Sequence, residues 1–186
     1  MVLNTSLMTV EEFDSFADNA ENAKRQLELI DGVIVEKRMP TELHEMIGGN
    51  FYVALRAYFK QRKTGRVFYE ARYKTDTMNA RLPDVAVRLG NAPIISKGSA
   101  PYIPDIGIEI QSPDDSIPEM RKKAAYYLSV GVKVVILVLT RKKLVVVLTP
   151  DSEEILTLED TLGDLNVLPE FEMSVKDIFA DDLENE

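Results

Sequence analysis

The stretches PDVAVRL at residues 83–89 and PDIGIEIQ at residues 104–111 decide the fold. Both alternate between apolar residues and other residues with the period of two that β-strands have. In the first stretch, Asp84 shares a face with Ala86 and Arg88, opposite the valines. In the second, three isoleucines face one way, and the opposite face carries Asp105, Gly107, Glu109 and Gln111. If the two strands are neighbours, the carboxylates of Asp84 and Glu109 can converge on the polar face.

Helix and turn signals surround these strands. The capping boxes Thr9–Glu12 and Ser116–Glu119 each begin a predicted helix, ending near residues 18 and 130. A longer helix over residues 40–62 is indicated by an apolar residue at every fourth position, namely Leu43, Ile47, Phe51, Leu55 and Phe59. Within that helix, Gly48-Gly49 either weakens it or lets another element approach closely.

Further strands complete the predicted sheet. We expect a hairpin of residues 25–30 and 33–37, followed by strands at 66–69, 71–75, 82–89, 104–111, 132–139 and 144–148, with a short one near 155. A last helix is expected at 174–179. The order of elements predicts an α/β (α+β) fold, with a mixed sheet flanked by helices. Residues 1–180 form a single domain in this interpretation, and residues 181–186 form an acidic tail.

Composition excludes several classes of protein. The chain has 186 residues, no cysteine and one histidine, His44, so disulfide frameworks, thiolate chemistry and multi-histidine metal sites are excluded. No apolar run is long enough to span a membrane, and the first ten residues do not resemble a signal peptide. We therefore expect a cytoplasmic protein without a membrane partner.

The charge is unevenly distributed along the chain. The formal net charge is −9, but residues 151–186 hold 13 acidic residues and a single basic one, Lys176. The first 150 residues are therefore mildly basic, with clusters at 60–66, 121–123 and 141–143. Such clusters are usually solvated faces, and they also permit contact with phosphates.

The pair of acids suggests metal chemistry. Two carboxylates side by side repel each other, and a divalent cation between them removes the repulsion; oxygen ligands favour Mg²⁺ or Mn²⁺. The alternative is a pair of half-exposed strands with ordinary polar outer faces. Because the acids lie on the polar face of each strand, we expect their substitution to leave the fold intact.

An ordered set of motifs resembles a known family. Pro83-Asp84 followed by Glu109-Ile110-Gln111 is similar to the PD-(D/E)XK motif of metal-dependent nucleases. Added to these are LELIDGVI at 27–34, His44, PD at 104–105, SPD at 112–114, Lys123, Tyr127 and GV at 131–132. This series resembles the Uma-two-type restriction endonuclease family over nearly the whole chain.

The resemblance implies a restriction-endonuclease-like mixed sheet flanked by helices, and a metal-dependent endonuclease that hydrolyses DNA phosphodiester bonds. Asp84, Glu109 and the backbone carbonyl of Ile110 would hold Mg²⁺ or Mn²⁺, which lowers the pKa of a bound water. Glu28 matches the family's early glutamate, close to the metal site. DNA is the expected partner, and a homodimer stays open.

The third motif position departs from the family. Gln111 stands where PD-(D/E)XK nucleases have lysine; it can orient a water but carries no charge. Lys123 matches a family lysine on the following helix and could point into the site; alternatively, it is an exposed helix lysine. His44 is either a surface or capping residue, or a proton carrier or phosphate contact near the site.

Two functions are therefore compared. The first is the nuclease just described, favoured by the acids and Lys123. The second is a catalytically inactive relative with the nuclease fold, which acts as a binding or oligomerisation module and is favoured by Gln111 and the acidic composition. A nucleotide-binding protein is disfavoured because no glycine-rich phosphate loop follows a strand.

Overall fold

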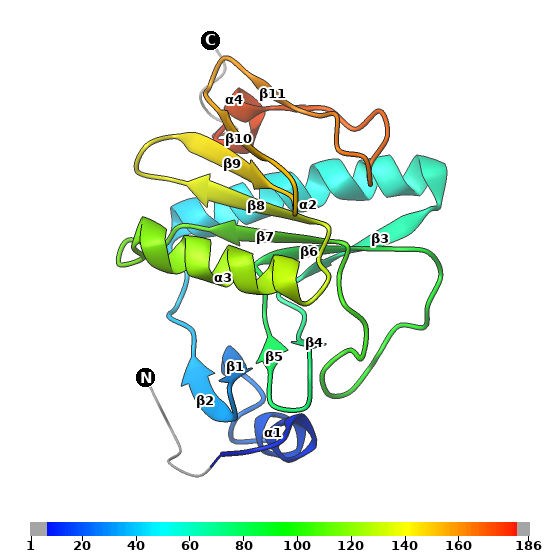
Figure 1. Ribbon diagram of the computed structural model, residues 1–186, viewed down its shortest axis with the longest axis vertical. Helices are drawn as coiled ribbons and strands as arrows, with labels where there is room; N and C mark the ends of the chain where they lie inside the picture. Colours follow the sequence, from blue (N-terminus) through cyan, green and yellow to red (C-terminus); the bar gives the residue numbers. More distant parts are fainter. Residues whose placement is uncertain (1–6, 182–186) are drawn as a thin grey trace.

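The main sheet of the computed structural model, which describes residues 7–181, has six strands (Figure 1). Their order is β10-β9-β8-β7-β6-β3, and only β7 and β8 run parallel. The bounds are β3 (Gly65–Tyr69), β6 (Val85–Leu89), β7 (Ile106–Ile110), β8 (Val134–Leu139), β9 (Leu144–Leu148) and β10 (Glu153–Leu156). Helix α3 (Ile117–Ser129) supplies the crossover that a parallel pair requires. The predicted mixed sheet flanked by helices is confirmed.

One helix covers each face of this sheet (Figure 1). The long helix α2 (Glu42–Arg62) packs Phe51 and Leu55 against the face that carries the three isoleucines of β7. On the opposite face, Ala124 and Tyr127 of α3 pack with Val135 and Leu137. Residues at odd positions of β7, Glu109 among them, therefore point toward α3.

A second, smaller sheet forms the N-terminal end of the fold. Its order is β2 (Val33–Glu36), β1 (Leu27–Ile30), β5 (Ala80–Arg81), β4 (Tyr73–Lys74), with helix α1 (Val10–Ala17) packed on it through Phe13. At the other end, β11 (Thr161–Leu162) and β12 (Met173–Ser174) pair, and α4 (Val175–Ile178) follows. Asn50 of α2 ties this end down, because its Nδ2 donates to the carbonyl of Ile178 at 3.2 Å.

The structure corrects two predictions about strands and adds two strands that were not predicted. The expected strand 82–89 is wrong at its start: Ala80–Arg81 belongs to the small sheet, and residues 82–84 link the two sheets. Pro83 in this link has no N–H to donate to a ladder. The expected strand 71–75 is reduced to Tyr73–Lys74. The two strands β11 and β12, which pair with each other, were not predicted.

The polar face of β6 and β7 is also buried, contrary to expectation. Arg88 and Glu109 are 4% and 6% exposed, because α3 and the loop after β6 cover this face. The α2 stripe is confirmed at four positions, but Leu43 is 46% exposed. Gly48 allows the expected close approach, since an added Cβ would lie 2.9 Å from the Tyr69 ring.

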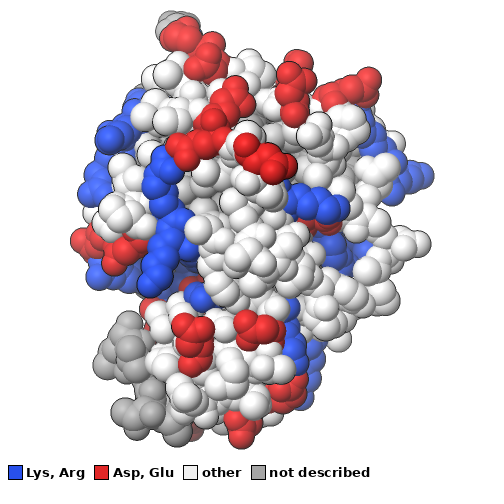
Figure 2. All heavy atoms as spheres, viewed as in Figure 1, with Lys and Arg blue, Asp and Glu red and all other residues white. Residues whose placement is uncertain are grey.

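The charge separation expected from the sequence is visible on the surface. Figure 2 shows acidic side chains gathered over the end that carries α4 and β11, and basic side chains along the flank beside α3. Of the predicted acidic tail, only Asp181 lies within the described residues. Within residues 7–181, no helix combines the length and apolarity needed to cross a membrane.

Candidate active site

A cavity of about 320 Å³ lies where the small sheet meets the main sheet, beside the N-terminal end of α2 and under α3. Its walls come from β1, the segment between β2 and α2, and the facing ends of β6 and β7. Six of its charged or titratable lining residues form one electrostatically coupled group, namely Glu28, Lys37, His44, Asp84, Glu109 and Lys123. Five of these six were predicted as site residues from the sequence, and the sixth, Lys37, was not.

Asp84 and Glu109 converge as expected from the alternation of their strands. The antiparallel register of β6 and β7 pairs Val85 with Ile108, which places Asp84 opposite Glu109. The N–H of Ile110 donates to Asp84 Oδ2 at 2.7 Å, which fixes the orientation of that carboxylate. Both acids are buried, at 2% and 6% exposure, and both line the cavity.

Asp84 receives two further partners from outside the main sheet. Lys37 Nζ lies 2.5 Å from Oδ1 and also donates to the carbonyl of Leu82 at 3.0 Å. His44 Nε2 lies 3.1 Å from Oδ2. Burial alone would raise the pKa of the Asp84 carboxyl, but the charge of Lys37 and the hydrogen bond from His44 outweigh burial and lower it. Asp84 is therefore an anion at neutral pH.

Glu109 is held by α3. Its Oε2 accepts from Lys123 Nζ at 2.9 Å, and its Oε1 accepts from the hydroxyl of Tyr127 at 2.8 Å. The expected contact between Lys123 and Glu109 is present. Burial raises the pKa of Glu109; Lys123 lowers it in part, but the negative charge of Asp84 adds to the effect of burial, and the net direction is upward.

Glu28 completes the acidic part of the site. It lies on β1, its Oε1 accepts from the N–H of Leu82 at 2.8 Å, and Lys123 Nζ is 3.4 Å away. Burial would raise its pKa, but Lys123 and Lys37 outweigh burial and lower it. Three carboxylates thus meet two ammonium groups, and these carboxylates in turn raise the pKa of both lysines against the effect of burial.

The structure also settles where the two remaining predicted residues lie. His44 is buried near the start of α2; burial lowers its pKa, but its hydrogen bond to Asp84 outweighs burial and raises it. Gln111 shares a face with Glu109, yet it is not among the described residues that line the cavity. Its Nε2 donates instead to the carbonyl of Asp115 at 3.1 Å, so it braces the loop after β7.

Sequence reasoning missed Lys37 and gave Tyr127 no role. Lys37 follows a strand whose residues show no polar pattern, so only the fold reveals that it reaches Asp84, 47 positions later in the sequence. Tyr127 had a signal, because it lies one helical turn after Lys123 and therefore on the same face of α3.

The donor set suits a hard divalent cation. Asp84 and Glu109 offer carboxylate oxygens on neighbouring strands, and Ile110 lines the same cavity. A carboxylate oxygen has two lone pairs, so Oδ1 of Asp84 and both oxygens of Glu109, which have one partner each, can accept a further ligand. Within residues 7–181, no group of three or more His, Cys, Asp or Glu side chains is already arranged around a common centre.

The fold and the site together define a nuclease-like protein, with a mixed sheet that carries two facing acids on adjacent strands. The chain belongs to the Uma2 family, described as "Putative restriction endonuclease", which it matches over residues 10–176. Among solved structures, it is similar to the crystal structure of "a putative nuclease belonging to DUF820" from Anabaena variabilis ATCC 29413. That similarity has a TM-score of 0.72 and 26% identity, over 82% of this chain and 89% of the other. No curated protein matches the sequence.

Proposed function

We propose that this protein is a Mg²⁺- or Mn²⁺-dependent endonuclease that hydrolyses phosphodiester bonds of DNA. The observation that supports this most strongly is the pair of facing carboxylates, Asp84 and Glu109, which line one cavity and share it with Lys123. This arrangement occurs in a chain of a nuclease-like family.

Asp84, Glu109 and the carbonyl of Ile110 are the groups that would hold the metal. A divalent metal supplies a coordinated water of lowered pKa and neutralises charge on the phosphate. Lys123 places a second positive charge beside Glu109, in a buried environment where Coulomb interactions are stronger than in water. Lys123 stabilises the negative charge that grows on the phosphate oxygens. Gln111 cannot take this role, because its side chain is neutral.

His44 is suited to proton transfer. Its Nε2 is held by Asp84, while its buried Nδ1 has no hydrogen-bond partner among the described residues. Because the hydrogen bond to Asp84 raises the pKa of His44, its imidazole stays protonated to a higher pH than an isolated histidine does. His44 can therefore donate a proton to the leaving oxygen of the ester or a hydrogen bond to the phosphate.

The second candidate is a catalytically inactive relative that serves as a binding or oligomerisation module. Gln111 favours it, and so does the internal saturation of the site, since each oxygen of Asp84 and Glu109 already has a partner. Calorimetric titration with Mn²⁺ separates the two functions. An active nuclease binds the ion at a site that Glu109→Gln removes, whereas the inactive module shows no such heat.

Cleavage itself is tested with supercoiled plasmid, which reports a single cut as a relaxed circle. We expect cutting with Mg²⁺ or Mn²⁺ and none with excess EDTA. The alternative function predicts an intact plasmid under both conditions. Tyr52→Phe, a substitution on α2 outside the cavity lining, is a matched control for handling and purity.

A further inference from the structure

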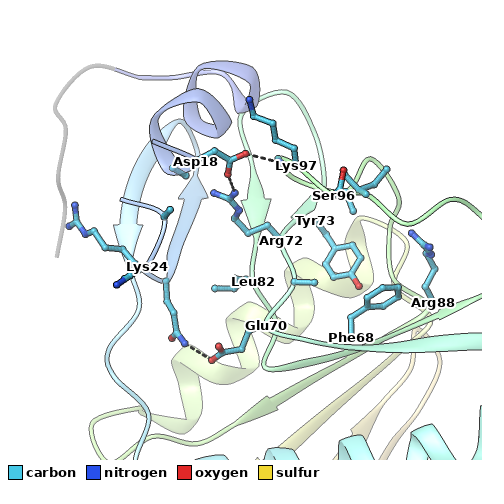
Figure 3. A pocket seen from close by; sticks show the side chains of 18 residues that line it. Asp18, Lys24, Phe68, Glu70, Arg72, Tyr73, Leu82, Arg88, Ser96 and Lys97 are labelled. Atoms are coloured by element: carbon cyan, nitrogen blue, oxygen red, sulfur yellow. Dashed lines mark hydrogen bonds and ion pairs between the residues drawn. The ribbon is translucent and has the colours of Figure 1, made fainter. Parts of the chain in front are cut away.

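A second cavity, of about 760 Å³, lies beside the candidate active site, and we call it the Tyr73 cavity. It opens between the small sheet, β3 and the loop that follows β6 (Figure 3). Its volume falls within the range of about 300–1,000 Å³ that ligand pockets occupy. The lining residues that matter here are Lys24, Phe68, Glu70, Tyr73, Arg88 and Lys97.

Only a thin wall separates the two cavities. Gln26 lines both of them, and its Nε2 donates to Glu70 of the Tyr73 cavity. The N–H of Glu70 in turn donates to the carbonyl of Asp84 at 3.0 Å. Leu82 also lines the Tyr73 cavity, while its backbone carbonyl accepts from Lys37 of the active site. A polymeric ligand bound at Asp84 can therefore place its next monomer in the Tyr73 cavity.

Tyr73 carries a buried hydroxyl without a partner. Its side chain is 2% exposed, and no group within residues 7–181 forms a hydrogen bond with the hydroxyl. Burial raises its pKa, so it is a neutral donor at physiological pH. A buried hydroxyl that forms no hydrogen bond is costly, and native structures rarely keep one without a ligand, a water or a function to satisfy it.

Phe68 lies next to Tyr73 and offers a half-buried ring for stacking. Arg88, which is 4% exposed and donates to the carbonyls of Ala92 and Pro93, supports the Phe68 ring from behind. Figure 3 shows Tyr73 and Phe68 side by side on one wall, with Arg88 just beyond. The Phe68 and Tyr73 rings meet edge to face at 6.5 Å, and the Arg88 guanidinium lies 5.1 Å from the centre of the half-buried Phe68 ring. Aromatic rings are groups on which proteins stack unpaired bases.

The rim of the cavity favours an anionic ligand. Lys24 and Lys97 line it with exposed side chains, and neither forms an ion pair with another described residue. The acidic residues of the lining are already engaged, Asp18 with Arg72 and Glu70 with Gln26. Two free ammonium groups at the edge of an aromatic cavity suit a base inside it and phosphates at its entrance.

We propose that the Tyr73 cavity receives one unpaired nucleotide of the substrate strand, next to the phosphodiester held at Asp84 and Glu109. The base stacks on Phe68 and meets the Tyr73 hydroxyl, and Lys24 and Lys97 contact the flanking phosphates. This inference rests on the proposed nuclease function. It narrows the substrate from duplex DNA in general to DNA with an unpaired nucleotide beside the cleaved bond.

The test compares two fluorescent duplexes that differ by one unpaired nucleotide. Fluorescence anisotropy in EDTA measures binding to the full chain without cleavage. We expect the duplex with the unpaired nucleotide to bind about tenfold more tightly than the fully paired one, which is the effect of stacking one base. Tyr73→Phe and Phe68→Leu should each remove most of this preference. Tyr52→Phe deletes a hydroxyl outside the cavity and should retain it.

The outcomes separate this inference from the proposed function. Equal binding of the two duplexes by the wild type, or a preference retained by both Tyr73→Phe and Phe68→Leu, would overturn the cavity assignment while plasmid cleavage stands. If the wild type binds neither duplex in EDTA, plasmid cleavage with Mg²⁺ or Mn²⁺ decides the nuclease function, and calorimetry with nucleoside monophosphates decides the cavity alone. Binding heat that the wild type shows and Tyr73→Phe lacks supports the assignment of the cavity to a nucleotide. An absence of binding heat for the wild type overturns that assignment. A melting temperature of Tyr73→Phe at or above that of the wild type shows that the variant is folded.

Discussion

Lys37 Nζ lies 2.5 Å from Oδ1 of Asp84, so a lysine that follows the small sheet compensates an acid that directly precedes β6 of the main sheet. Asp84 is buried and the Lys37 side chain is only 18% exposed, and the pair joins the two sheets at the candidate active site. The ammonium also contacts the very carboxylate that would hold a metal. Lys37 and a divalent cation therefore compete for Asp84.

This competition predicts that added Mg²⁺ stabilises Lys37→Met more than it stabilises the wild type. The substitution leaves the Asp84 charge poorly compensated, and breaking a buried pair in this way costs about 3–5 kcal/mol of unfolding free energy. Added Mg²⁺ should recover part of the loss, so the rise in melting temperature should be larger than in the wild type. Lys74→Met, which removes an outlying pair with Glu11, is the control. An identical Mg²⁺ shift in all three proteins would refute the competition.

Lys123 and Lys122 form a natural pair for mutagenesis. They are neighbours on α3, but Lys123 contacts Glu109, whereas Lys122 is exposed. We expect Lys123→Met to lower the turnover of plasmid cleavage by at least about tenfold, and Lys122→Met to leave it within about twofold of the wild type. Equal losses in the two variants would show that Lys123 has no role in the site.

Glu28 should contribute a pH dependence to stability. Its pKa is lowered in the folded state by Lys123 and Lys37, so its contribution is fully present above the unfolded value of about 4.3. That contribution is lost as the pH falls below this value and through the lower folded pKa. Urea unfolding between pH 6 and 3 should therefore show a shallower decline for Glu28→Gln than for the wild type. Glu172→Gln, at an exposed position, should decline like the wild type.

Gly48 and Gly49 should respond to alanine with opposite signs. At Gly49 nothing lies within 4 Å of an added Cβ, so Gly49→Ala gains helix propensity worth about 0.5–1 kcal/mol. At Gly48 the Cβ would be 2.9 Å from the Tyr69 ring, whose hydroxyl is tied to Glu45 at 2.8 Å. Gly48→Ala should therefore lower the unfolding free energy. Chemical denaturation of both variants checks the contrast, and stabilisation by both would contradict it.

The sequence predicted those parts of the fold that depend on local periodicity. The isoleucines of β7 and the apolar stripe on α2 indicate which face of each element is buried, and the capping boxes indicate where two helices begin. The division into two sheets could not be predicted, because residues 82–89 read as one continuous strand and nothing marked Ala80–Arg81 as part of another sheet. Only the pairing of Ala80 with Leu29 shows that the chain leaves one sheet before it enters the other.

The candidate site divides in the same way. Asp84 and Glu109 follow from strand alternation, while Glu28, His44 and Lys123 were expected through their place in a family pattern. Lys37 was indicated neither by strand alternation nor by the family pattern, and its contact with Asp84 joins the two sheets. The burial of Asp84 and Glu109 was likewise invisible in the alternation, since a polar face covered by a helix has the same pattern as one covered by water. We now expect Asp84→Ala to destabilise the fold.

The most direct test of the paired carboxylates is plasmid cleavage by Asp84→Asn and Glu109→Gln, which preserve shape and remove charge. Both variants should be folded by circular dichroism, and both should lose the Mg²⁺- or Mn²⁺-dependent cutting of the wild type by at least about a hundredfold. A folded variant of either kind that cuts at the wild-type rate would contradict the assignment of Asp84 and Glu109 as the metal-holding pair.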